Sequence, residues 1–108
     1  MEETLERMSG DRDLLANLFQ LFMDDAPKKL SKIELYAEQG EYYQIERAAH
    51  SLKGAAATVG AAQLCQLAAE LELAAKGRLL EQLAQLQRDL ARVCDQTLTA
   101  MREFSASN

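Results

Sequence analysis

Apolar residues recur along the chain at intervals of three and four, the spacing that collects them on one face of an α-helix. No stretch has the alternation of apolar and polar residues that is typical of a half-buried strand. The helices that this pattern predicts cover residues 11–26, 25–40, 42–59, 61–76 and 79–104, and a run at 2–8 suggests a loose turn or one further short helix. The pattern therefore predicts an all-α protein.

Proline and glycine mark where these helices begin and end. Pro27 is the only proline, and the first turn of a helix accepts proline because the missing N–H would have no partner there. We therefore expect one helix to end at Asp24 and Asp25, and a second to begin with Asp25 as its N-cap. Glycines that follow apolar runs predict the other helix ends, at Gly40, Gly60 and Gly77.

The connections between the predicted helices are short, so neighbouring helices are expected to be antiparallel. The last helix carries a long apolar seam, which requires partner helices. A chain of 108 residues suggests one core. We expect a single domain over 1–108, with an antiparallel helical bundle over about 11–104, a short additional N-terminal helix packed on it, and a frayed tail at 105–108.

Composition removes several classes of function. The formal net charge of −5 argues against nucleic-acid binding, which requires a basic face. No apolar run reaches the roughly 18 residues of a membrane span, and MEETLERMSG lacks the features of a signal peptide. We therefore expect a cytoplasmic protein without membrane contact. Cys65 and Cys94 form no CxxC pair and are expected to be semi-buried thiols rather than metal ligands.

The single histidine, His50, lies in the predicted helix 42–59. A helix turns by about 100° per residue, which puts His50 roughly 160° from the centre of the apolar stripe and therefore toward solvent. Lys53 and Gly54 lie on the next turn of the same face. A surface histidine usually has no chemistry, but glycine inside a helix costs about 1 kcal/mol relative to alanine. We expect a function to offset that cost.

Phosphoryl transfer fits this group of residues. An imidazole with an ordinary pKa of about 6.5 is mostly neutral near pH 7 and is a competent nucleophile. Lys53 is placed to pair with the anion that the ring would carry. The missing side chain at Gly54 lets another protein approach the ring closely.

The stretch AAHSLKGAAATVG, residues 48–60, resembles the signature of histidine-containing phosphotransfer (HPt) domains. GDRDLLANLFQLFMDDAP resembles the first bundle helix of that family and its turn, and LCQLAAELE resembles the helix that follows Gly60. The resemblance extends over residues 5–104. It implies a four-helix bundle in which His50 accepts a phosphoryl group from the aspartyl phosphate of a receiver domain and passes it to an aspartate of another receiver.

The same resemblance implies that Lys53 stabilises the phosphate and that Gly54 makes room for the receiver. It implies response-regulator receiver domains as partners, including the receiver of a hybrid sensor kinase. The receiver would supply Mg²⁺, so the bundle is expected to have no cofactor or metal site of its own and to be a carrier rather than an autonomous enzyme. We expect a monomer, because one bundle can close its own core.

The sequence departs from the family at two positions near the histidine. Ala55 replaces a frequent serine, and Glu72 occupies a position where some members have glutamine. Glu72 could accept a hydrogen bond from the ring but would repel a phosphate, so we interpret it as a solvated charge.

A docking surface is expected beside His50. Leu14, Leu18, Leu21 and Phe22 are the apolar positions that we assign to the core side of the first helix. Phe19 and Met23 lie off the centre of that stripe, so we expect them to be exposed and, with Gly54 and Ala57, to contact the receiver. The alternative is that Phe19 and Met23 pack against the N-terminal segment.

Two other functions remain open. The chain resembles the phosphoacceptor domain of chemotaxis-type kinases, which takes its phosphoryl group from an ATP-bound kinase domain. A helical adaptor without phosphate chemistry is the other, and it predicts that His50→Gln leaves partner binding unchanged.

Overall fold

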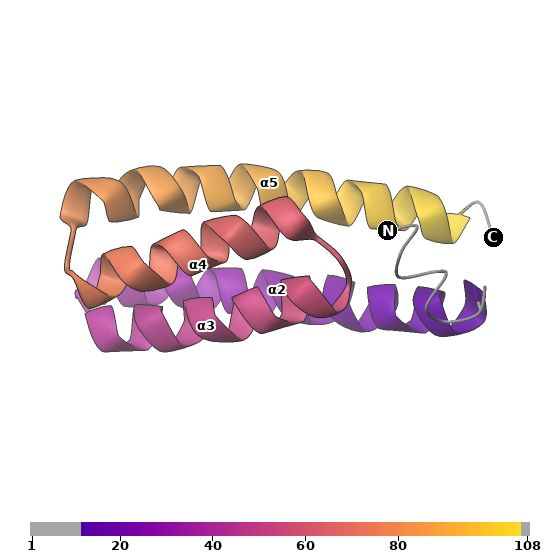
Figure 1. Cartoon of the computed structure of the whole chain (residues 1–108), viewed down its shortest axis with the longest axis horizontal. Coiled ribbons are helices and arrows are strands. Elements are labelled where there is room, and N and C mark those ends of the chain that lie inside the picture. The colour runs from indigo at the N-terminus through magenta and orange to yellow at the C-terminus, as the bar shows by residue number, and fades with distance from the viewer. Residues whose placement is uncertain (1–11, 107–108) are drawn as a thin grey trace.

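The computed structural model describes residues 12–106 as four helices, α2 (Arg12–Gln39), α3 (Tyr42–Thr58), α4 (Ala62–Lys76) and α5 (Leu80–Ala106). Successive helices run in opposite directions (Figure 1). Each helix packs against two others, in the cyclic order α2, α3, α4, α5. The predicted all-α class and antiparallel four-helix bundle are confirmed, whereas the short helix expected at 2–8 lies outside the described residues.

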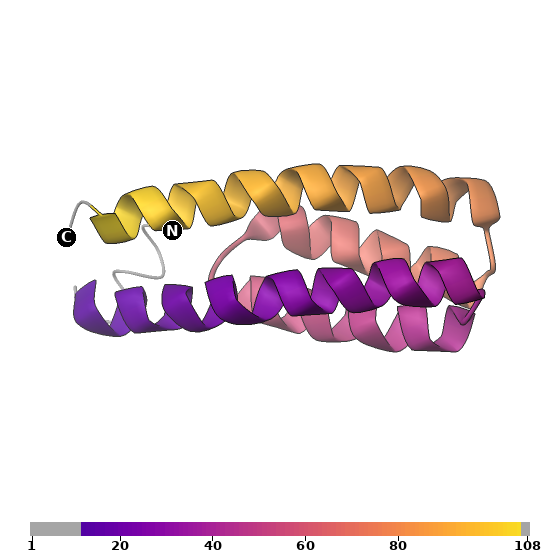
Figure 2. The same ribbon diagram turned by 180° about the vertical axis from the view of Figure 1, so that it is seen from behind.

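The first and last helices, α2 and α5, are longer than α3 and α4. α2 and α5 extend past α3 and α4 at one end of the molecule (Figures 1 and 2). The Phe19 ring of α2 and the Phe104 ring of α5 meet edge to face, with centroids 5.2 Å apart. α5 also continues to Ala106. Residues 105–106 are therefore helical, whereas we predicted that the frayed tail begins at residue 105.

α2 is one helix where the sequence predicted two. Pro27 lies inside it, although an interior proline removes one backbone hydrogen bond and costs about 3 kcal/mol. Phe22 and Ala26 are buried before the proline and Ile33 after it. Because these side chains face one core, their packing keeps the two halves in one continuous helix, and the predicted break at Asp25 is wrong.

The buried face of α2 also differs from the prediction. Leu15 and Phe19 are buried, whereas Leu14 and Leu21 are 46% and 66% exposed. Apolar residues lie on several sides of this helix, so periodicity alone left its rotation undetermined. Contact with Phe104 of α5 favours the rotation that puts Phe19 inside.

Each turn between helices contains a residue with a left-handed backbone conformation. Gly40 has φ +67° and Gly60 has φ +75°, the conformation that glycine adopts without strain. In the third turn Arg78 takes this role, with φ +53°, and Gly77 keeps a right-handed conformation. The Arg78 guanidinium lies 5.5 Å from the centroid of the Tyr42 ring, which ties this turn to the start of α3.

The core of residues 12–106 contains no buried polar or charged residue. Cys94 is buried and Cys65 is partly buried, and both are free thiols. Burial, and secondarily the charge of Asp95, raises the pKa of the Cys94 thiol. None of the described helices combines the length and hydropathy that crossing a bilayer requires.

Candidate functional site

His50 projects from α3 into solvent, as predicted. The buried side of α3 is formed by Ile45, Ala49, Leu52 and Ala56. The His50 side chain lies on the outer side and is 67% exposed. A reacting group on another protein can therefore reach the ring directly.

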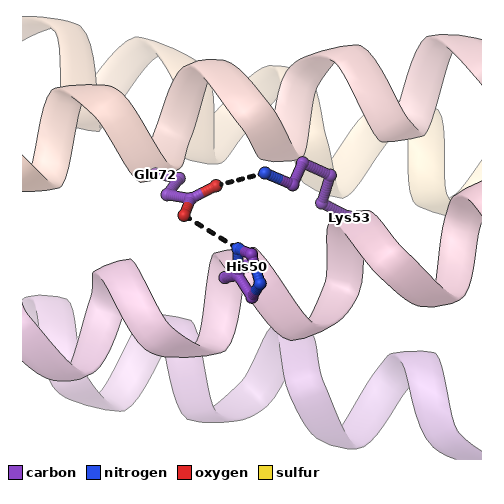
Figure 3. Close-up of polar contacts among 3 residues, drawn as sticks. All are labelled: His50, Lys53 and Glu72. Atoms are coloured by element: carbon purple, nitrogen blue, oxygen red, sulfur yellow. Dashed lines mark hydrogen bonds and ion pairs between the residues drawn. The ribbon is translucent and has the colours of Figure 1, made fainter.

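Glu72 joins His50 to Lys53. It projects from α4, and its carboxylate lies between the imidazole and the ammonium group (Figure 3). Its Oε2 is 2.9 Å from His50 Nδ1, and its Oε1 accepts a hydrogen bond of 2.8 Å from Lys53 Nζ. The interpretation of Glu72 as a solvated charge is wrong, because its side chain is only 21% exposed and contacts both residues.

This arrangement selects which ring nitrogen of His50 carries the hydrogen that faces Glu72. The hydrogen bond from Lys53 is the main cause that lowers the pKa of Glu72; burial opposes it, and the hydrogen bond with His50 adds to it. An ionised carboxylate only accepts hydrogen bonds, so Nδ1 of His50 carries the proton and donates to Oε2. In the neutral ring Nε2 then has a free lone pair that faces away from Glu72.

Lys53 lies on the histidine side of α3, as predicted, with its side chain 34% exposed. Its charge is already matched, because the ammonium is bound to Glu72. The sequence predicted that Lys53 would be available to a phosphate, and the structure adds a competitor for it.

Gly54 and Ala57 leave little bulk on the C-terminal side of His50. Both residues are exposed, and a Cβ added at Gly54 would meet nothing within 4 Å. The packing of residues 12–106 therefore does not require glycine at this position. The Thr58 hydroxyl donates to the Gly54 carbonyl at 3.0 Å, so that carbonyl is satisfied within the helix.

The expectation that Phe19 is an exposed docking residue is wrong. Phe19 is 0% exposed because α2 turns it toward Phe104. Met23 is half-buried and packs against the core. Between α2 and α3 there is instead an open groove of about 490 Å³, and its lining includes Leu18, Leu21 and Thr58.

A second depression, of about 410 Å³, contains His50 itself. Its lining also includes Tyr43, Glu46, Arg47 and Glu72. The Arg47 guanidinium lies 5.9 Å from the centroid of the Tyr43 ring. Within residues 12–106, no three histidine, cysteine or acidic side chains are grouped as a metal site requires.

Comparison with known proteins adds one match to this geometry. No curated protein and no solved structure matches the chain significantly. The family model described as "Hpt domain" matches residues 17–104, which include His50, Lys53 and Glu72. Because the match covers most of the sequence, the chain belongs to the Hpt domain family.

Proposed function

We propose that His50 is the phosphoacceptor of a phosphorelay carrier, which takes a phosphoryl group from the aspartyl phosphate of one receiver domain and gives it to an aspartate of another. Members of the Hpt family serve as histidine phosphotransfer intermediates and interact with receiver domains. The observation that carries the assignment to His50 is the hydrogen bond of its Nδ1 with Glu72, which leaves Nε2 of an exposed ring free to react.

The proposed reaction needs no separate base. The Nε2 lone pair attacks phosphorus, the bond from phosphorus to the aspartyl oxygen breaks, and aspartate leaves as a carboxylate. The ring becomes a phosphorylated imidazolium whose Nδ1–H still donates to Glu72. The carboxylate thereby stabilises the positive ring that forms, and the same steps in reverse return the phosphoryl group. The receiver is expected to supply Mg²⁺.

The receiver would approach over the C-terminal half of α3. Gly54 and Ala57 offer it a surface with almost no side chains, and the groove lined by Leu18 and Leu21 lies beside them, between α2 and α3. Met23 was predicted to be exposed on this surface, but it is half-buried and packs against the core.

The experiment mixes the protein with a panel of receiver domains that have been phosphorylated with radiolabelled acetyl phosphate. Label should appear on the protein, should be lost in acid and retained in base, and should be absent from His50→Gln. Failure of every receiver, with label transferred instead from a kinase domain and ATP, would favour the chemotaxis-type acceptor. Unchanged partner binding by His50→Gln, with no label from either donor, would favour the adaptor.

A further inference from the structure

The charges around His50 do not yet balance the group that it would carry. A phosphoryl group brings close to two negative charges at neutral pH. Lys53 is the cation expected to meet them, but its ammonium is bound to the carboxylate of Glu72. The positive and negative charges of this pair cancel, so a phosphorylated His50 would need a further cation.

Arg47 is the nearest candidate along α3. It lies three residues before His50, one turn away on the outer side of the helix. It is exposed and borders the same depression as His50 and Glu72. Glu46 borders that depression too, yet among residues 12–106 no carboxylate lies within ion-pair distance of Arg47.

On its side toward α2, Arg47 faces basic residues and, within the part of the chain that the structure describes, no acidic ones. There Arg47 borders another depression, separate from the one that contains His50, and its lining includes Lys29 and Lys32 of α2. The acidic partner of Lys29 is Asp25, which also belongs to α2. The contact that Arg47 does make is with the face of the Tyr43 ring. This contact holds the guanidinium without neutralising it.

We propose that Arg47 supplies the positive charge that receives the phosphoryl oxygens on His50, with Tyr43 as its resting position. This inference rests on the proposed carrier function. A guanidinium presents paired N–H donors in a rigid planar fork that matches two phosphoryl oxygens, whereas an ammonium acts as a compact point charge. Arg47 is therefore a positioning and charge-matching residue for the phosphorylated form, and the Lys53–Glu72 pair remains intact.

The test uses the whole chain without a partner. Phosphoramidate phosphorylates the ring when its P–N bond breaks, ammonia leaves and a bond from Nε2 to phosphorus forms. Phosphorus NMR then follows protonation of the phosphoryl group as the pH is changed. A nearby cation favours the dianion, so Arg47→Ala should bind the phosphoryl proton about threefold more tightly, and Arg47→Lys should fall between it and the unchanged protein.

The matched control is Arg102→Ala, which removes an exposed arginine near the C-terminal end of α5. Its titration should match that of the unchanged protein. Circular dichroism on each variant checks that the bundle is folded, and Arg47→Gln provides a second neutral variant.

Two failures are distinguishable. If the unchanged protein gives no phosphohistidine signal that depends on His50, both the carrier function and this inference are overturned. If His50 is phosphorylated but Arg47→Ala and Arg47→Gln titrate like the unchanged protein, the inference about Arg47 is wrong and the carrier function stands.

Discussion

Replacement of Gly54 by alanine should make the protein more stable and a poorer phosphoryl carrier. Gly54 lies inside α3, where alanine is favoured over glycine by about 1 kcal/mol. An added Cβ meets no atom within 4 Å, and the residue has no left-handed φ, so no clash or strain subtracts from that gain. For a domain of this size, about 1 kcal/mol corresponds to a rise in Tm of roughly 4–8 °C.

The same methyl group should obstruct the partner. Bulk inserted into a closely packed contact costs about 1–3 kcal/mol, so transfer from a phosphorylated receiver should slow by about 5- to 150-fold. Phosphorylation of His50 by phosphoramidate, a molecule far smaller than a receiver, should proceed at the normal rate. The pair of measurements separates an obstructed surface from a damaged nucleophile.

Ala57→Gly is the matched control, because Ala57 is exposed on the next turn of the same helix. This change should lower the free energy of unfolding by about 1 kcal/mol and should leave transfer largely intact, since it removes bulk from the surface. Urea denaturation gives both stabilities. A Gly54→Ala protein that is stabilised and still accepts the phosphoryl group at the normal rate would refute the docking role of Gly54, and a destabilised one would contradict the open space found beside it.

Three further predictions concern the fold and the site. Phe19→Ala should lower the free energy of unfolding by about 3–5 kcal/mol, because the ring is fully buried; a loss below 1 kcal/mol in urea denaturation would contradict that burial. Pro27→Ala should raise the free energy of unfolding by about 2 kcal/mol by restoring an N–H to the interior of α2, and a lower Tm by calorimetry would contradict a continuous helix. Glu72, whose pKa is lowered below its ordinary value of 4.5, stabilises the fold above that pH and loses this contribution as the pH falls through its lowered pKa. The difference in stability between the unchanged protein and Glu72→Gln should therefore be constant near neutrality and shrink below about pH 4.5, and a difference that grows in acid would reverse the assigned direction.

The orientation of α3 could be predicted from the sequence because its two sides differ sharply. Its core side carries Ile45 and Leu52 among alanines, and the opposite side carries His50 and Gly54. Only one rotation of such a helix buries its apolar residues. The exposure of the ring and the position of Lys53 on the same side followed directly.

The rotation of α2 about its own axis could not be predicted in the same way. Leu14 and Leu15 are adjacent, and so are Leu18 and Phe19, so two rotations that differ by one residue bury similar areas. Packing against α5 selects the second rotation. The error at Pro27 has the same origin, since a local rule for proline was overridden by contacts that only the assembled bundle provides.

The sequence could predict that Glu72 and His50 lie at the same height along the bundle, but not that Glu72 lies on the side of α4 that faces α3. The turn at Gly60 is short, so the distance of a residue from this turn can be compared along the axes of α3 and α4. His50 lies eight residues before Thr58, which is about 12 Å along α3. Glu72 lies ten residues after Ala62, which is about 15 Å along α4. The two are therefore nearly level.

The position of a residue along the helix axis does not decide which side of α4 faces α3. The buried stripe of α4 includes Leu71, with Glu70 on one side of it and Glu72 on the other. In the structure Glu70 borders a groove shared with α5, and Glu72 reaches α3. A bundle of the opposite hand would exchange these two sides and turn Glu70 toward α3. Helical periodicity is the same in both hands, so the acidic partner of the imidazole is set by the hand of the bundle, which no spacing within one helix encodes.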